Sequence, residues 1–477
     1  MVKESENISN YRRKAHVVFL LSNGFAARMM LRSGIASQLT THDVQVTIIS
    51  PNADEVYFQQ ECQQEGVGLH KDPGVTGRAA EMFRLLRPYL LDDVINNPAL
   101  KTKHRRLREH RPIFGLFIEI VNRTLARQPL FRKLSTFIEI LINRSEMIQE
   151  MLCTLQPDLL VLPNPFGRIE TVYLIHARRL GVPVVCQMLS WDNITTKGTP
   201  LLMPDYFISW GPIMTEEMVS IYHFPRNKIY ECGVAHFDVY SQKEKLTPRD
   251  ILLKEMHLPQ ELPYIFYGMV AELYCPNELE ILAWLAEQVQ RNAFAKPCSL
   301  IIRPHPLTIS GSYASDSRNI KRLKSLVGPR VALDIPPVLS EQLAWDLPKQ
   351  DMYRLASLID GSSMCINAGS TLCLDSCMLD CPIINISFDG FEELPYEKSA
   401  RRALDCVHIK KLFALNGVRV ACSFSDLEKF FDLYLCDSTI DHDSRVQSAI
   451  QECGPQDGCA TDRVVNTLLQ LTYQNTS

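Results

Sequence analysis

The first half of the chain alternates between short apolar runs and longer stretches in which apolar residues recur every three or four positions. The apolar runs are rich in β-branched residues and end at turn residues, which is typical of strands. Strands that are apolar throughout and separated by helices indicate a parallel sheet covered on both faces. Residues 1–240 are therefore predicted to form one doubly wound α/β domain. Its predicted strands are residues 15–23, 44–51, 158–165, 182–189, 206–211 and 228–234.

The alternation stops and then resumes in the second half. Residues 241–262 are rich in charge and proline, which predicts a linker. Further apolar runs predict a second doubly wound, Rossmann-like domain over residues 263–425, and residues 426–477 are predicted to form a helical tail. The predicted strands of this domain are residues 264–270, 298–306, 330–336, 363–369 and 382–390.

Length and composition fit two α/β domains. A chain of 477 residues is long for one core, and its 46% hydrophobic and 22% charged residues are those of a globular protein. The formal net charge of -4 gives no reason to expect nucleic acid as a partner. Because the first apolar run, residues 15–21, is too short to span a bilayer and lacks a signal-peptide pattern, a cytoplasmic location is expected.

The cysteines do not form a metal-binding pattern. Cys373, Cys377 and Cys381 repeat every four residues, which places them on one helical face and differs from the paired Cys-x2-Cys of zinc sites. The chain also lacks a Gly-x-Gly-x-x-Gly after its first strand and a Walker lysine loop, which argues against dinucleotide and P-loop enzymes. We therefore expect no metal and no cofactor.

The strongest candidate site lies in residues 367–386, where a predicted strand passes through Gly369 into a predicted helix. Glycine allows close approach of a ligand to the backbone, and the amides of Ser370 and Thr371 would point outward at the positive end of the helix. This arrangement suits a phosphate or diphosphate. Asp375 follows about one and a half turns later, where its carboxylate could accept hydrogen bonds from ribose hydroxyls.

The pattern Ser-Thr-x-x-x-acid-small, followed by an apolar stretch, a proline and a strand, resembles the nucleotide-binding helix of GT-B glycosyltransferases. The resemblance implies a GT-B-like fold, with two Rossmann-like domains facing each other across a cleft. It also implies that Gly369, Ser370 and Thr371 hold the donor diphosphate and that Asp375 holds the ribose. The acid is usually glutamate in that superfamily, so this chain departs from the pattern by one methylene.

The segment Arg303–Pro306 reads Arg-Pro-His-Pro at the end of a predicted strand. It resembles the same turn in CDP-glycerol and polyol-phosphate transferases, which are also GT-B proteins. The resemblance implies that Arg303 and His305 lie near the donor phosphates, with His305 in a catalytic role. Arginine can grip a phosphate with two hydrogen bonds, and histidine can donate one.

Residues 190–198, SWDNITTKG, follow a predicted strand of the first domain. In the polyol-phosphate transferases the similar segment reads roughly Trp-His-Gly-Thr-Pro-x-Lys, so Trp191, Thr196 and Lys197 resemble its distant counterparts. Asp192 replaces the catalytic histidine and is predicted to be the general base for the acceptor hydroxyl. Asn193 is assigned to the acceptor side, and a β-α loop with a purely structural role is the alternative.

Other predicted contacts follow strands of the two domains. After the first strand, Asn23, Gly24 and Arg28 are candidates for the acceptor side. After the first strand of the second domain, Gly268 and Glu272 are candidates for the donor side. A structural role remains the alternative for each of these residues.

Residues 101–133 hold ten Lys or Arg against two Glu, with apolar residues interleaved. A basic amphipathic segment can lie on an anionic membrane, where each basic residue contributes about 1 kcal/mol. Peripheral contact with the inner face of a membrane is therefore one interpretation. A solvated basic helix face is the other.

These features together predict a metal-independent glycosyltransferase. A GT-A enzyme is disfavoured because the Asp-x-Asp pattern at residues 441–443 lies in a polar segment and follows no apolar strand. The expected donor is a nucleotide sugar or nucleotide-activated polyol, and the expected acceptor is a surface polysaccharide or lipid-linked glycan. Three alternatives stay open: a CDP-polyol phosphotransferase, a nucleotide-sugar 2-epimerase and a non-catalytic GT-B scaffold.

Overall fold

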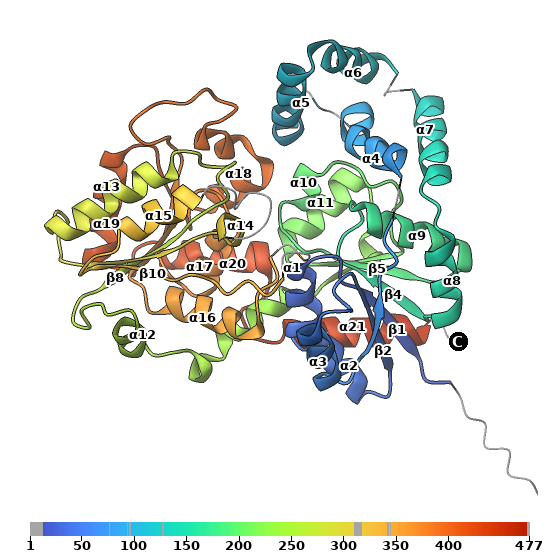
Figure 1. Ribbon diagram of the computed structural model, residues 1–477, viewed down its shortest axis with the longest axis horizontal. Coiled ribbons are helices and arrows are strands. Elements are labelled where there is room, and N and C mark those ends of the chain that lie inside the picture. Colours follow the sequence, from blue (N-terminus) through green and yellow to red (C-terminus); the bar gives the residue numbers. More distant parts are fainter. Residues whose placement is uncertain are drawn as a thin grey trace, which may run out of the picture.

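The computed structural model describes residues 13–474, except for residues 76, 93, 95, 96, 126, 127, 310–316, 341, 342 and 344. It contains two parallel β-sheets, one in each half of the chain, with helices packed around them (Figure 1). The predicted architecture of two doubly wound α/β domains is confirmed.

Within the described residues, the first sheet has seven strands in the order β3-β2-β1-β4-β5-β6-β7. The chain runs outward from β1 to β3 and then returns to β4 on the other side of β1. The strands are β1 His16–Leu20, β2 Gln45–Ser50, β3 Gly68–Lys71, β4 Leu159–Leu162, β5 Val184–Gln187, β6 Tyr206–Ser209 and β7 Ile229–Glu231. Ligands in such sheets bind where the strand order reverses, at the carboxyl ends of the strands.

The second sheet has six strands in the described part of the chain, in the order β10-β9-β8-β11-β12-β13. It reverses direction between β8 and β11. The strands are β8 Tyr264–Gly268, β9 Ser299–Arg303, β10 Val331–Leu333, β11 Met364–Asn367, β12 Ile383–Ile386 and β13 Arg419–Ala421. Side chains on one face of this sheet join the core of the first domain, and those on the other face form a separate core.

Most helices of the first domain cover the first sheet. They are α1 Gly24–Ala26, the π-helix η1 Ala27–Arg32, α2 Ile35–Thr41, α3 Val56–Gln64, α8 Glu146–Leu155, α9 Arg168–Leu180, α10 Asn193–Thr196, α11 Pro212–Tyr222, and the short 3-10 helices η2 Arg226–Lys228 and η3 Ala235–Ser241. Apolar residues on α9 and its neighbours face the sheet, as expected for helices of an α/β domain.

Four helices between β3 and β4 stand apart from this layer. We call residues 78–142 the helical insert; its helices are α4 Arg78–Leu91, α5 Pro98–His110, α6 Pro112–Thr124 and α7 Pro129–Ile142. Figure 1 shows the insert above the first domain, with α6 farthest from the sheet. No helix in the described ranges is both long and apolar enough to cross a membrane.

The remaining helices surround the second sheet, and the last one returns to the first domain. They are η4 Lys243–Lys245, α12 Arg249–Glu255, α13 Glu278–Arg291, α14 Pro306–Ile309, α15 Ser317–Ser325, α16 Lys349–Asp360, α17 Leu372–Met378, η5 Ala400–Asp405, α18 Val407–Ala414, α19 Phe424–Cys436, α20 His442–Cys453 and α21 Ala460–Gln474. Helix α21 packs on α2 and η3. Asp238 of η3 accepts hydrogen bonds from the amides of Ala460 at 3.0 Å and Thr461 at 2.7 Å, which caps the start of α21.

The chain therefore passes between the domains twice, after η3 and again between α20 and α21. The two passages lie next to each other at Ser241, the last residue of η3, and Gly458, which has a φ of 69°. A Cβ on Gly458 would lie 2.8 Å from the Cβ of Ser241. Only a residue without a side chain suits this approach.

A second contact joins the domains near the start of the chain. The buried guanidinium of Arg32 donates to Asp346 at 2.6 Å and to Glu61 at 2.8 Å. A Cβ on Gly24 would lie 2.4 Å from the Cα of Asp346. Gly24 therefore permits close backbone packing between the domains, which differs from the predicted acceptor contact.

Candidate active site

A cavity of about 290 Å³ lies between the two domains. From the first domain it is lined by α5 and by residues 190–197, which follow β5. From the second domain it is lined by the ends of β8, β9 and β11 and by η5 and α18. The predicted site residues on its wall are Trp191, Asp192, Thr196, Lys197, His305, Gly369, Ser370 and Thr371. Two distant sequence motifs and the turn after β11 thus meet at one place, as expected for carboxyl ends of parallel strands.

Gly369, Ser370 and Thr371 form the turn between β11 and α17. Gly369 has a φ of 80°, and its amide donates to the side chain of Asn367 at 3.0 Å. The hydroxyl of Ser370 accepts a hydrogen bond from the amide of Leu372 at 3.2 Å and so supports the first turn of α17. Gly369, Ser370 and Thr371 reach the cavity through this turn.

His305 lies on the cavity wall as a neutral imidazole. Withdrawal from solvent lowers its pKa to about 4, so the ring carries no charge near neutral pH. The amide of Leu307 donates to Nδ1 at 3.2 Å, which places the ring proton on Nε2. His305 can therefore donate a hydrogen bond to an anion but does not supply a positive charge there.

Arg303 is not on the cavity wall, and its predicted contact with the donor phosphate stays a prediction. Its buried guanidinium pairs with Asp334, and it also pairs with Asp351 at 2.5 Å. A buried arginine requires such partners, and these carboxylates occupy its donors. Arg303 fastens β9 to the segment after β10 and to α16.

Asp375 also lies away from the cavity wall. It is buried, and its Oδ1 accepts a hydrogen bond from the hydroxyl of Tyr240 in η3. Burial raises the pKa of Asp375 to about 6, although the Tyr240 hydrogen bond and the nearby charge of Arg28 act in the opposite direction. Arg28 is itself buried in η1. The Tyr240 hydrogen bond links Asp375 of α17 to the first domain, and the contacts of Asp375 with ribose and of Arg28 with an acceptor stay predictions.

Four other predicted contacts are placed as packing or neighbouring groups. The side chain of Asn23 accepts from the amide of Ala26 at 2.9 Å and caps α1. A Cβ on Gly268 would lie 2.3 Å from Leu372, so Gly268 permits close packing under α17. Asn193 is buried at the start of α10, and Glu272 lines a separate cavity beside β8.

Asp192 is held in place by hydroxyl groups. Ser190 Oγ donates to Oδ1 at 2.5 Å, and Thr196 Oγ1 donates to Oδ2 at 3.0 Å. Withdrawal from solvent alone would raise the pKa of Asp192, but His408, Lys197 and these hydroxyls outweigh it and lower the pKa. Asp192 is therefore ionised, and its carboxylate is a weaker base than an unshifted one.

His408 faces Asp192 from the other domain and was missed in the sequence. Its Nδ1 lies 3.0 Å from Thr195 Oγ1, and its ring packs edge-on against Trp191 with centroids 4.8 Å apart. Burial lowers the pKa of His408, although the negative charge of Asp192 opposes this shift. A single histidine in a helical stretch carries no motif, so only the folded arrangement reveals it.

Four basic side chains give the cavity a positive wall. Lys103 and Arg106 come from α5, Lys197 follows α10, and Arg402 comes from η5. Asp192 is the only acid on this wall among the described residues. Lys103 donates to the carbonyl of Thr196 at 3.0 Å, and desolvation together with the nearby Lys197 lowers its pKa to about 8. The excess of positive charge suits a diphosphate.

Two doubly wound domains with their carboxyl edges facing a shared cavity define the GT-B fold, and the prediction of this fold is confirmed. No protein-family model matches the chain, and no curated protein sequence matches it. Solved structures are similar. The UDP-GlcNAc 2-epimerase from Neisseria meningitidis, bound to UDP-GlcNAc, has a TM-score of 0.54 at 12% identity, covering 95% of this chain and 100% of its own.

Two further solved structures have the same arrangement. The S. aureus MnaA-UDP structure has a TM-score of 0.54 at 8% identity, covering 96% of this chain and 97% of its own. A glycosyltransferase from Rickettsia africae has a TM-score of 0.52 at 10% identity, covering 98% and 100%. At these identities the similarity defines the fold and leaves the reaction open.

Proposed function

We propose that this protein is a glycosyltransferase that moves a sugar from a nucleotide-sugar donor to a lipid-linked or surface-polysaccharide acceptor. The observation that carries the proposal is the positive wall of the interdomain cavity, which within the described residues has four basic side chains and one carboxylate. Solved proteins of the same fold are described with UDP or UDP-GlcNAc bound, which supports a nucleotide-sugar donor.

In the proposed reaction the diphosphate of the donor rests against the Gly369–Thr371 turn. Lys197 and Arg402 neutralise charge as the sugar–phosphate bond breaks, and Nε2–H of His305 donates a hydrogen bond to a phosphate oxygen. These side chains supply the stabilisation that a divalent cation provides in other transferases, so the proposed reaction uses no metal and no cofactor.

The acceptor hydroxyl must lose a proton as it attacks the sugar. Asp192 is the proposed base, with the proton moving from the acceptor oxygen to its carboxylate while the nucleoside diphosphate leaves. His408 is a second candidate, because its neutral imidazole lies in the same cavity and can accept a proton. The variants Asp192→Asn and His408→Gln distinguish the two candidates. Loss of the base should abolish turnover and leave donor binding intact.

A nucleotide-sugar 2-epimerase is the second candidate function. Asp192 and His408 both line the cavity, and two such groups could remove and return a proton on one sugar carbon. An epimerase would convert the donor without an acceptor. A transferase would release the nucleoside diphosphate only when an acceptor, or water in its place, receives the sugar.

The first experiment is a thermal-shift screen of the purified chain with UDP, GDP, CDP, CMP and ADP. We expect one base to raise the melting temperature, and we expect Lys197→Met to reduce that shift. Lys254→Met, on the exposed face of α12, is the matched control and should bind as the wild type does. If no nucleotide or nucleotide sugar shifts the melting temperature, the chain is a non-catalytic scaffold and the proposal fails.

Incubation with nucleotide sugars of the selected base then identifies the reaction. Product analysis without acceptor distinguishes epimerised donor from intact donor. A polyol phosphate transferred from a CDP-polyol would instead identify the phosphotransferase that the Arg-Pro-His-Pro turn resembles.

A further inference from the structure

Helices α6 and α7 of the insert expose continuous apolar stripes to solvent. On α6 the stripe runs through Ile113, Phe117 and Ile120, and on α7 it runs through Leu130, Leu134 and Phe137. Ile113 and Leu130 are 86% and 79% exposed, and the two phenylalanines are each 58% exposed. The spacing of three or four residues places each set on one helical face.

Other side chains of α6 and α7 face the rest of the insert. Helix α6 packs on α5 through Gly115, where a Cβ would lie 2.7 Å from the Cα of Arg108. The residue of α7 that is buried, within the described residues, is Glu139, which pairs with Arg87 of α4 at 2.6 Å. Helix α7 therefore buries a charge and exposes its apolar face, the reverse of a helix in a domain core.

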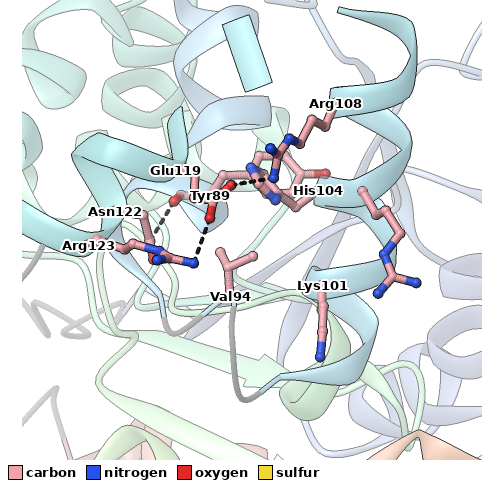
Figure 2. Close-up of a pocket in the computed structure, with 9 residues that line it drawn as sticks. Tyr89, Val94, Lys101, His104, Arg108, Glu119, Asn122 and Arg123 are labelled. Carbon is pink, nitrogen blue, oxygen red and sulfur yellow. Dashed lines mark hydrogen bonds and ion pairs between the residues drawn. The ribbon is translucent and has the colours of Figure 1, made fainter. Parts of the chain in front are cut away.

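A group of basic side chains lies beside α6, on a different face of the helix from its apolar stripe. A pocket of about 320 Å³ between α4, α5 and α6 is lined by Lys101, His104, Arg105, Arg108 and Arg123 with Glu119, and we call it the basic pocket. Figure 2 shows Arg108 and Arg123 pointing at Glu119 from two helices, at 2.8 and 2.6 Å. Arg105 reaches Glu397 of the second domain. The pocket keeps an excess of positive charge, in a chain whose net charge is -4.

We propose that the helical insert is a docking surface for an anionic lipid membrane. The apolar stripes of α6 and α7 enter the boundary between headgroups and acyl chains, and the basic pocket receives a lipid phosphate. Exposed apolar area combined with local positive charge is the signature of interfacial helices. A second copy of the chain fits less well, because two such inserts would face each other with like charges.

The position of the insert connects this surface to the active site. Helix α5 contributes Lys101, Arg105 and Arg108 to the basic pocket and also Thr102, Lys103 and Arg106 to the interdomain cavity. A membrane bound at the insert would bring a lipid-borne acceptor to the edge of the cavity. This link to the acceptor rests on the proposed function, whereas the membrane contact does not.

Vesicle sedimentation tests the docking surface. The full chain is mixed with phosphatidylcholine vesicles with and without phosphatidylglycerol, and we expect binding to the anionic vesicles that weakens as salt is added. The variant Phe117→Glu with Phe137→Glu should bind about tenfold less. The variant Arg108→Gln with Arg123→Gln should lose most of its preference for the anionic vesicles. Val56→Glu replaces an exposed apolar residue on α3 and should bind as the wild type does.

Three outcomes overturn the inference. They are wild-type protein that stays in solution with anionic vesicles, a phenylalanine variant that binds like the wild type, and a wild-type dimer that this variant converts to monomers while neither form binds vesicles. The last outcome would assign the stripes to a second copy of the chain. The nucleotide-induced thermal shift should be the same in both insert variants and the wild type, which separates this test from failure of the proposed function.

Discussion

The helical insert and the sheet-forming domains differ in what their helices leave exposed. Helix α9 of the first domain buries Val172 and Leu174, whereas α7 of the insert buries Glu139 and exposes Leu134 and Phe137. The insert also buries some apolar residues, among them Ile118 on α6. The apolar stripes of α6 and α7, however, have no partner within the described chain. Apolar residues at helical spacing therefore face the core in one region and solvent in the other. The spacing alone does not distinguish the two cases.

The largest expected difference between the two regions is the loss of unfolding free energy when an arginine charge is removed. Arg303→Met removes the partner of two buried carboxylates, so we expect the free energy of unfolding to fall by about 4 kcal/mol. Arg108→Met in the insert breaks an exposed ion pair and should cost less than about 1 kcal/mol. Urea denaturation followed by circular dichroism measures both. Equal losses would mean that the insert depends on its ion pairs as much as the domains do.

Truncation of leucines tests the same contrast with apolar side chains. Leu174→Ala opens a cavity beneath α9, and we expect a loss of about 3 kcal/mol in the free energy of unfolding. Leu134→Ala removes atoms that already face water and should change stability by less than about 0.5 kcal/mol. A loss above this value at Leu134 would show that the α7 stripe is covered in solution.

Nucleotide affinity should depend on arginine in the interdomain cavity and not on arginine in the basic pocket of the insert. Arg402→Gln removes a positive charge from the interdomain cavity, and we expect about thirtyfold weaker nucleotide binding, or ~2 kcal/mol. Arg123→Gln removes a charge from the basic pocket and should leave nucleotide affinity unchanged. Isothermal titration with the nucleotide selected in the screen measures both. Equal effects would place the nucleotide elsewhere.

The smallest expected effect concerns pH. Because the pKa of Lys103 is lowered to about 8, this side chain is charged at pH 7 and loses its charge as the pH rises through that value. Affinity for an anionic nucleotide should therefore fall by about fivefold between neutral and alkaline pH. Lys103→Arg should flatten the profile, since arginine stays charged. Lys101→Arg in the basic pocket should leave the profile as it is.

The apolar runs of the sequence predicted the buried strands and hence the two-domain fold. They missed β3, Gly68–Lys71, and β13, Arg419–Ala421, because each lies at the edge of its sheet and most of their side chains are not buried. Periodicity depends on burial, so a strand at the edge of a sheet leaves little trace. The amphipathic pattern of residues 101–133 was visible in the sequence, but which apolar side chains face solvent depends on how the helices pack and was visible only in the structure.

The candidate site was predicted where a local motif sets the geometry. Gly369 and Ser370 lie at a turn whose shape depends on neighbouring residues, and the structure places both on the cavity. Arg303 and Asp375 are not on the cavity wall, and this was not visible in the sequence because their partners, Asp334, Asp351 and Tyr240, come from distant parts of the chain. A sequence motif shows which groups are present and does not show which are already paired.

The double passage of the chain between the domains restricts how the protein can move. Two covalent connections run side by side at Ser241 and Gly458, so rotation of the domains about the line through them is less restricted than sliding or twisting. The interdomain cavity would then widen and narrow along one path, with α5 and α18 on opposite sides of the opening. A chain shortened before α21 would lose the second connection and expose the surface of α2 that α21 covers. Helix α21 is therefore part of the first domain in its packing, although it follows the second domain in sequence.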